Sequence, residues 1–303
     1  MRSGTLQNAT LLGLFTSGVL IVGCTSDARK DVSSPSLGAD SGTVMPATLP
    51  GAAAPVALPA TTPVDVRTAK AAWKEGVVRF DHGEFAAASE QLKIAVAGEP
   101  GNAYRRYLLG LALWKSGDRD GAEASLVESV KLDATRVKPW INLARVRNER
   151  GDRNGALEAA DTALALDPDS ADALHQKGRA LMELSRGDEA LTALTAARSL
   201  DGQNGYIANT LGLLLIQLGR PADAVEPLES AKLVLPHVAY VRNNLGVAYE
   251  RTGRMDEAKI EYLAGVDAGD AGGKAMKSLV RLGATDTTQP LEGTVETAAK
   301  TPQ

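Results

Sequence analysis

The stretch GYIANTLGLLLIQLGRPADAVEPLESAKLVLPHV, residues 205–238, is the clearest copy of a pattern that occurs six times between residues 69 and 270. Successive copies begin 34 residues apart, and each has a small residue at position 8 and alanine at position 20. These residues are Gly76, Gly110, Ala144, Gly178, Gly212 and Gly246, and Ala88, Ala122, Ala156, Ala190, Ala224 and Ala258. A fixed period with two helical stretches per copy predicts a helical solenoid whose units pack on their neighbours.

Turn and stop signals divide each copy into two helices. Glycine at position 15 permits a positive φ between the helices in five copies, whereas the fourth copy has Ser185-Arg186-Gly187 and shifts its glycine by two residues. Proline at position 32 of three copies stops the second helix because it cannot continue the hydrogen-bond ladder. Four aspartates are placed to cap the second helix, namely Asp118, Asp120, Asp152 and Asp256.

The small residues at positions 8 and 20, leucine at positions 7, 11 and 24, and proline at position 32 resemble the tetratricopeptide repeat. The resemblance implies an all-α fold, a right-handed superhelical solenoid of six helix-turn-helix units, with helices A and B crossing where positions 8 and 20 face each other. The six units span residues 69–102, 103–136, 137–170, 171–204, 205–238 and 239–270. Residues 271–283 are expected to form a capping helix, in which Met276, Leu279, Val280 and Leu282 cover the apolar end of the array.

The N-terminal residues carry a pattern typical of export. Arg2 precedes the apolar run ATLLGLFTSGVLIVG at residues 9–23, which is short for a membrane span and long enough for a signal peptide. The run leads into Leu20-Ile21-Val22-Gly23-Cys24, which resembles the lipobox of bacterial lipoproteins. The resemblance implies a signal peptide at residues 1–23, acylation of Cys24, and anchoring in the bacterial cell envelope, with the outer membrane favoured, facing the periplasm. The alternative is an ordinary signal peptide with an unrelated cysteine.

Two further segments have the composition of disordered chain. Residues 24–66 are rich in proline, alanine, serine and threonine and contain no aromatic residue, and residues 284–303 are similarly polar. Such segments bury too little apolar surface to offset the entropy of ordering. We expect a tether at residues 24–66 that separates the anchor from repeats over residues 67–270, and a disordered tail at residues 284–303.

The sequence contains no pattern typical of an enzyme, a metal site or a cofactor site. His82, His175 and His237 fall at different positions of the repeat, and the chain has one cysteine and no glycine-rich phosphate loop. The net charge of −4 argues against general affinity for nucleic acid, because binding to phosphate needs a basic excess. We expect no catalytic residue, metal ligand, cofactor or nucleic-acid partner.

A protein or peptide partner is expected on the concave face, which the family lines with positions 2, 5, 6, 9, 12 and 13 of helix A, here called the groove positions. In the first two units they carry aromatic anchors, which are Trp73, Phe80, Tyr104, Tyr107 and Trp114. Later units supply basic side chains suited to an acidic segment and amides suited to a peptide backbone, which are Lys138, Asn142, Arg145, His175, Gln176, Arg179, Asn209, Asn243 and Asn244. The alternatives are packing between helices, because Glu75 replaces leucine at position 7, and a solvated charged face.

These features together indicate a non-catalytic, membrane-anchored scaffold or adaptor that binds proteins of the cell envelope, with pilus or secretion-system assembly as its specific role. A second hypothesis is a subunit that recruits substrates to a separately encoded glycosyltransferase, peptidoglycan hydrolase or protease. A third is a structural spacer. The residues that maintain the repeat are common to all three hypotheses, so only the groove positions can distinguish them.

Overall fold

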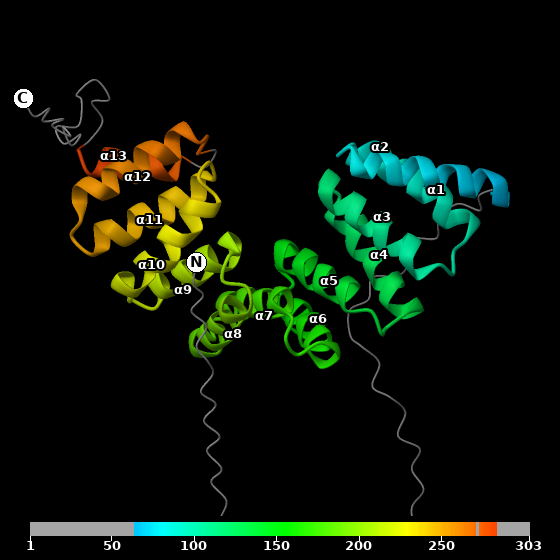
Figure 1. The fold of residues 1–303 in the computed structure, drawn as a ribbon, viewed down its shortest axis with the longest axis horizontal. Coiled ribbons are helices and arrows are strands. Elements are labelled where there is room, and N and C mark those ends of the chain that lie inside the picture. Colours follow the sequence, from blue (N-terminus) through cyan, green and yellow to red (C-terminus); the bar gives the residue numbers. More distant parts are fainter. Residues whose placement is uncertain (1–63, 271–272, 284–303) are drawn as a thin grey trace, which may run out of the picture. The chain divides into compact units, whose positions relative to one another are not determined.

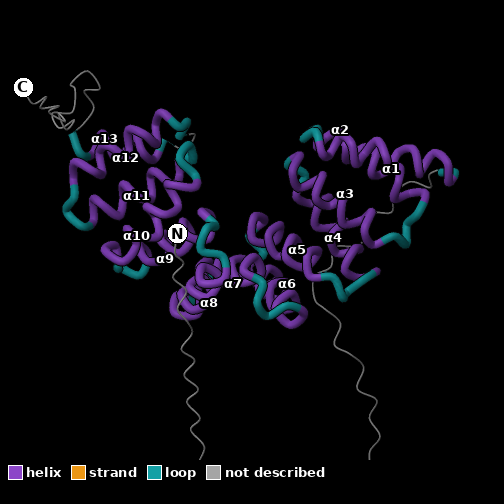
Figure 2. The backbone as a smooth tube through the Cα atoms, viewed as in Figure 1, coloured by secondary structure: helices purple, strands orange, loops and turns teal. Residues whose placement is uncertain are grey.

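The computed structural model describes residues 64–270 and 273–283, which form helices joined by short turns without any strand (Figures 1 and 2). The first helices of the six pairs are α1 (Val66–Asp81), α3 (Ala103–Ser116), α5 (Val137–Arg150), α7 (Ala171–Glu183), α9 (Gly205–Gln217) and α11 (Ala239–Arg251). The second helices are α2 (Phe85–Gly98), α4 (Arg119–Leu132), α6 (Arg153–Leu166), α8 (Gly187–Leu200), α10 (Pro221–Val234) and α12 (Met255–Asp267), and α13 (Lys274–Arg281) follows them. The expected signal peptide, the acylated Cys24, the tether up to residue 63 and the tail lie outside the described residues.

Packing follows the order of the chain. Each helix contacts the next one from α1 through α13, and helix A of one unit also contacts helix A of the following unit from α3 to α11. Figure 1 shows these successive helix pairs. The predicted all-α repeat of helix pairs is therefore confirmed, and the helix A surfaces of adjacent units are brought next to each other.

The turn from helix A to helix B uses the left-handed backbone conformation in every unit. Five units place glycine there with a φ between +73° and +94°, at Gly83, Gly117, Gly151, Gly219 and Gly253. In the fourth unit Ser185 itself adopts a φ of 59°, so the turn is kept without glycine, and Gly187 begins α8. Asp118 and Asp152 cap α4 and α6 as expected. Asp120 and Asp256 lie in the first turn of their helices and do not cap them.

Position 8 lies where helix A crosses helix B, and the side chain closest to it is the one at position 24, in addition to the expected position 20. A β-carbon added at Gly110 would lie 2.8 Å from Cγ of Leu126, and one added at Gly178 would lie 2.5 Å from Cγ of Leu194. The pairing recurs in five units as Gly76–Leu92, Gly110–Leu126, Gly178–Leu194, Gly212–Leu228 and Gly246–Tyr262. The alanines at position 20 are fully buried, and the backbone oxygen of Ala122 would be 3.3 Å from the Gly110 β-carbon. Close helix contact therefore depends on the absence of a side chain at position 8.

The third unit distributes volume differently across the same crossing. It has Ala144 at position 8 and Ala160 at position 24, where the other units have glycine paired with leucine or tyrosine. Both alanines are fully buried in one apolar cluster. A methyl group gained on helix A is thus accompanied by a smaller side chain on helix B, as close packing requires.

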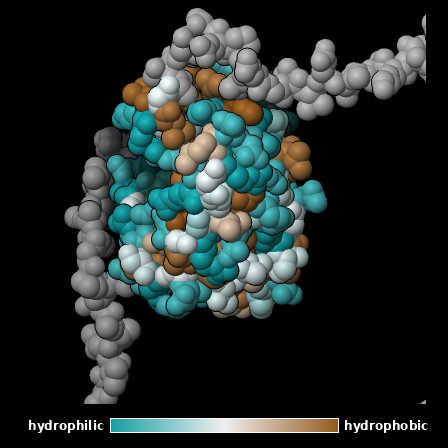
Figure 3. All heavy atoms as spheres, turned by 90° about the vertical axis from the view of Figure 1, so that its left-hand side faces the viewer, coloured by the Kyte–Doolittle hydropathy of each residue, from teal (hydrophilic) through white to brown (hydrophobic). Residues whose placement is uncertain are grey.

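The expected capping helix forms as α13, but only part of the expected apolar set covers the array. Leu279 is buried, and Leu282 packs against the same cluster as the last units. Met276 and Val280 are 42% and 56% exposed, which corrects their assignment, because Ala275 and Leu279 occupy the face four residues apart that meets the array. Figure 3 views the side of the molecule that holds α10–α13 and shows hydrophobic groups scattered among hydrophilic ones.

Candidate functional site

Groove positions of units three to six line a surface depression, here called the central hollow, with a volume of about 620 Å³. It is lined by Asn148, Glu149, Arg150, Gly151, Arg153, His175, Arg179, Met182, Glu183, Tyr206, Asn209, Thr210, Leu213 and Tyr240. All of these except Arg150, Gly151 and Arg153 occupy groove positions of α5, α7, α9 or α11. The surface expected from the repeat register is therefore hollowed, and it brings together His175, Arg179 and Asn209 from the predicted set.

His175 is buried in the wall of the central hollow. Its Nε2 lies 2.9 Å from Oγ1 of Thr210 on α9, so this contact connects units four and five. Burial, together with the positive charges of Arg179 and Arg145, lowers the pKa of His175 to about 3. His175 is therefore neutral at physiological pH, and it contributes a hydrogen bond to the site in place of a charge.

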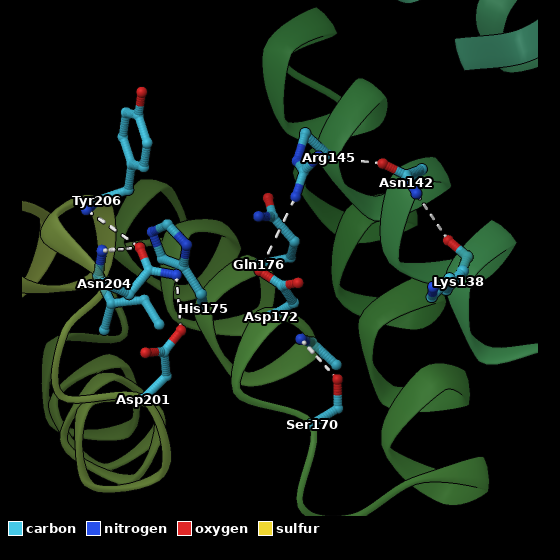
Figure 4. Close-up of polar contacts among 12 residues, drawn as sticks. Lys138, Asn142, Arg145, Ser170, Asp172, His175, Gln176, Asp201, Asn204 and Tyr206 are labelled. Carbon is cyan, nitrogen blue, oxygen red and sulfur yellow. Dashed lines mark hydrogen bonds and ion pairs between the residues drawn. The ribbon is translucent and has the colours of Figure 1, made fainter. Parts of the chain in front are cut away.

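Two arginines at position 9 are held in the same way in neighbouring units. Nη1 of Arg145 donates to Oδ1 of Asn142 at 3.0 Å, and Nη1 of Arg179 donates to Oε1 of Gln176 at 3.2 Å. In Figure 4, Arg145 extends from α5 toward Gln176 and Asp172 of α7, whereas the ring of Tyr206 points away from them. A guanidinium fixed by an amide oxygen at position 6 is thus a repeated feature of units three and four.

The charges around the central hollow are paired except at Arg179. Oε2 of Glu149 accepts from Nε of Arg119 at 3.2 Å and from Nε1 of Trp114 at 3.0 Å. Arg153 pairs with Glu183 at 3.2 Å, and Arg150 pairs with Asp120 and Glu123. No carboxylate lies within 4.0 Å of Arg179 in residues 64–270 and 273–283. Burial lowers the pKa of its guanidinium, and the more distant charges of Glu149 and Glu183 offset this effect only in part.

The predicted amides other than Asn243 are bonded within the chain, whereas the buried Oδ1 of Asn243 has no partner among the described residues. Nδ2 of Asn244 donates to Oδ1 of Asn209 at 3.0 Å, and Nδ2 of Asn142 donates to the Tyr107 hydroxyl at 3.2 Å. Gln176 is only 1% exposed, and both its backbone and its side-chain oxygen accept hydrogen bonds from Asn148. Asn243 is half-buried and does not line the central hollow. The amides therefore connect adjacent units, a role that the sequence pattern did not indicate.

The aromatics of the first two units mostly pack on the apolar cluster beneath them. Trp73, Phe80, Tyr107 and Trp114 are half-buried against it, and Phe80 meets Phe85 edge to face at 5.3 Å. Trp73 stacks edge to face on Tyr104, with ring centroids 5.8 Å apart. Packing between helices, the alternative interpretation of these residues, accounts for most of the set.

Part of the aromatic set lines a second, smaller hollow of about 550 Å³, here called the aromatic hollow. It is lined by Tyr104, Tyr107, Arg136, Val137, Lys138 and Pro139. Lys138 and Tyr104 are exposed there, and the Arg136 guanidinium lies 5.2 Å from the centroid of the Tyr104 ring. The structure thus brings Lys138 together with the aromatics and separates it from His175 and Arg179.

Sequence reasoning missed the most exposed aromatics of the central hollow. Tyr206 and Tyr240 are 53% and 49% exposed, and neither hydroxyl has a hydrogen-bond partner in the part of the chain that the structure describes. Both occupy position 2, as does Tyr104 in the second unit. The signal was therefore present, because the groove positions applied to units five and six select these two tyrosines.

The described residues carry neither a metal signature nor a membrane signature. No cluster of three or more histidine, cysteine, aspartate or glutamate side chains placed to hold a metal ion occurs among them. None of the helices within residues 64–270 and 273–283 combines the length and apolar character that crossing a bilayer requires.

Fold and site together define a helical-repeat protein with a polar, tyrosine-rimmed hollow on its helix A surface. The chain belongs to the tetratricopeptide repeat family, whose models match residues 74–135, 148–214 and 209–273. No curated protein matches the sequence.

Solved structures show the same fold in distant proteins. A thermophilic TPR protein of Thermus thermophilus is 22% identical with a TM-score of 0.53, over 59% of this chain and 100% of its own. MamA of Desulfovibrio magneticus RS-1 is 20% identical with a TM-score of 0.50, over 55% of this chain and 94% of its own. A chain of the APC/C hetero-tetramer Cut9-Hcn1 is 15% identical with a TM-score of 0.65, over 70% of this chain and 42% of its own. At these identities the likeness concerns the fold.

Proposed function

We propose that this protein is a non-catalytic scaffold that binds a segment of a partner protein in the central hollow. The main support is that groove positions from four successive units meet in this hollow and leave Tyr206 and Tyr240 exposed with unbonded hydroxyls. Tyrosine presents a large, rigid surface at a small cost in conformational entropy, and its hydroxyl can bond a peptide group. The buried contacts beneath, such as His175 with Thr210, hold this surface in one conformation.

The anchored form of this scaffold is also part of the proposal. Its support is the lipobox-like segment ending at Cys24 and the proline-rich residues that follow. A lipid anchor with a tether holds the repeats at the envelope while they bind a partner. The specific role proposed is assembly of a pilus or secretion system. Several of the amides that suggested a substrate-recruiting subunit are bonded to other side chains of this chain, so they favour that second hypothesis less than the sequence pattern did.

Site-specific photo-crosslinking tests the binding surface. A benzoylphenylalanine introduced at Tyr206 or Tyr240 should trap one envelope protein in cells, whereas the same residue at Glu158, exposed on helix B of unit three, should not. Mass spectrometry of the adduct identifies the partner, and a pilus or secretion component is expected. Equal capture from both faces, or capture from neither, would refute the proposed surface.

The anchor is tested separately by fractionation. Cys24→Ser should move the protein from the membrane fraction to the soluble fraction of the envelope and remove the acyl mass from its N-terminal peptide. A wild-type N-terminal peptide without acyl groups, together with unchanged membrane retention of the variant, would contradict lipid anchoring and leave the binding surface unaffected.

A further inference from the structure

The central hollow holds one guanidinium whose charge the described residues do not pair. Every other charged side chain in its lining is engaged, since Glu149 contacts Arg119, Arg153 contacts Glu183, and Arg150 contacts Asp120. Arg179 donates only to the neutral oxygen of Gln176. The buried imidazole beside it is neutral and supplies no countercharge. Glu149 and Glu183 act on Arg179 only from beyond 4.0 Å, and burial still lowers the pKa of its guanidinium. A half-buried cation without a direct ion pair is costly, so the hollow is complementary to one negative charge.

The surroundings of Arg179 favour an anion with hydrogen-bonding oxygens. Tyr240 is close enough for Arg179 to lower its pKa, against the larger upward effects of burial and of Tyr206. Tyr206 and Tyr240 each present an unbonded hydroxyl from position 2 of successive units. The hollow is thus lined by a guanidinium fixed through an amide oxygen and by two tyrosines with unbonded hydroxyls, all of which can donate hydrogen bonds to a carboxylate.

We propose that the central hollow recognises an acidic residue in an extended segment of its partner, with Arg179 binding the carboxylate and Tyr206 and Tyr240 donating from the rim. This inference rests on the proposed function and adds the chemistry of the partner to it. One carboxylate matches the single unpaired guanidinium. A phosphate dianion would bring a second negative charge toward Glu149 and Glu183, which line the same hollow.

Peptide display on the full chain supplies a probe while the partner is unidentified. A library of random dodecapeptides is selected against the wild-type protein and counter-selected against Tyr206→Ala, so that retained peptides depend on the hollow. The expected result is enrichment of aspartate or glutamate at one position. Individual peptides are then measured by fluorescence anisotropy, where replacing that acidic residue by its amide should raise the Kd at least tenfold.

Substitutions in the protein test whether Arg179 binds the acidic side chain of the peptide. Arg179→Gln should raise the Kd of a selected peptide at least tenfold, and it should not add to the effect of the amide-substituted peptide, because both changes remove the same contact. Arg179→Lys should recover part of the affinity. Arg220→Gln, which removes an exposed charge from the start of helix B in unit five, is the matched control and should leave the Kd unchanged.

The outcomes separate the two proposals. If peptides are selected without acidic enrichment, or if acidic ones bind Arg179→Gln as tightly as wild type, the carboxylate assignment is wrong and the binding surface stands. Tighter binding of a peptide with phosphoserine at the acidic position also overturns it. If no peptide depends on Tyr206, both proposals fail. Tyr240→Phe, which removes only a hydroxyl, should weaken acidic peptides more than their amide counterparts, and an equal loss for both argues against the donor role.

Discussion

Trp73 in the first unit and Tyr206 in the fifth both occupy groove positions, yet the structure uses them differently. Trp73 is half-buried and packs on the apolar cluster and on Tyr104, whereas Tyr206 stands exposed at the rim of the central hollow. The two residues occupy different groove positions, since Trp73 is at position 5 and Tyr206 is at position 2. Tyr104, at position 2 of the second unit, is likewise 45% exposed. The comparison teaches that the groove positions differ in how far they expose a side chain, so that an aromatic residue at position 5 packs and one at position 2 is available for binding.

The largest expected effect comes from breaking the helix crossing that both regions share. In Gly212→Trp the first side-chain carbon alone would lie 2.8 Å from Cδ2 of Leu228, so helices A and B of unit five must separate. We expect a loss of about 3 kcal/mol or more in the free energy of unfolding, measured by urea denaturation. Gly110→Trp should cost a similar amount in unit two, and Gly101→Trp, where nothing lies within 4 Å, should cost little. A small effect at Gly212 would contradict the observed register.

The second test compares the two aromatics directly. Trp73→Ala removes a half-buried ring from the cluster and should lower stability by about 2–3 kcal/mol, below the range for a fully buried tryptophan. Tyr206→Ala should change stability by less than about 0.5 kcal/mol, because its ring is exposed and its hydroxyl unbonded. Thermal melts of both variants measure whether the loss of stability is larger for Trp73→Ala than for Tyr206→Ala. Equal losses would mean that the two regions do not differ in the way that their burial indicates.

A pH series sharpens the comparison at the buried polar wall. The folded-state pKa of His175 is lowered from 6.5 to about 3, so the unfolded chain binds the extra proton between these values. The free energy of unfolding is therefore unaffected by protonation of His175 above pH 6.5. Below pH 6.5 it falls, by up to about 2 kcal/mol between pH 6.5 and 5. His175→Gln should remove that part of the slope in urea titrations at several pH values. If the free energy of unfolding depends on pH equally in both proteins, His175 is not held in its neutral form in the folded protein.

The smallest effect is expected at the turn of unit four. Ser185 holds a left-handed φ of 59° that the other units assign to glycine. Ser185→Gly should stabilise the protein by about 0.5–1 kcal/mol, because glycine adopts this conformation without strain. Gly151→Ser at the corresponding turn of unit three is the converse variant and should destabilise by a similar amount. Differential scanning calorimetry can resolve both shifts, and a destabilised Ser185→Gly would show that its side chain contributes more than the turn strain costs.

The fold was predictable to the level of individual turns, because the signals are local and repeated six times. Small residues at position 8 and glycine at position 15 indicated the crossing and the left-handed turn, and both occur in the structure. The sequence pattern did not indicate that the side chain at position 24 lies closest to position 8, since Leu228 looked like ordinary core. Met276 was misplaced because an eight-residue helix has several apolar residues, and sequence alone does not show which face meets the array.

The candidate site was predictable as a set of positions and not as a set of contacts. The register assigned His175, Arg179 and Asn209 to one surface, and in the structure all three line the central hollow. It could not show that Asn209 is bonded to Asn244, because that contact joins side chains 35 residues apart across two units. Tyr240 was not among the predicted site residues, although it occupies position 2 of its unit as Tyr104 does.

The sequence by itself determined the helix pairs, their phase and the residues that form each crossing. These features depend on interactions within one repeat, and the same residue pattern occurs in all six repeats. Only the tertiary structure decided which groove residues are exposed, which amides are satisfied and which charge has no partner. Those properties depend on how side chains of neighbouring units meet, so the same residue type at the same repeat position can have different partners in different units. Arg179 illustrates this, since its lack of a carboxylate partner among the described residues follows from the pairing of Glu149 and Glu183 with other arginines.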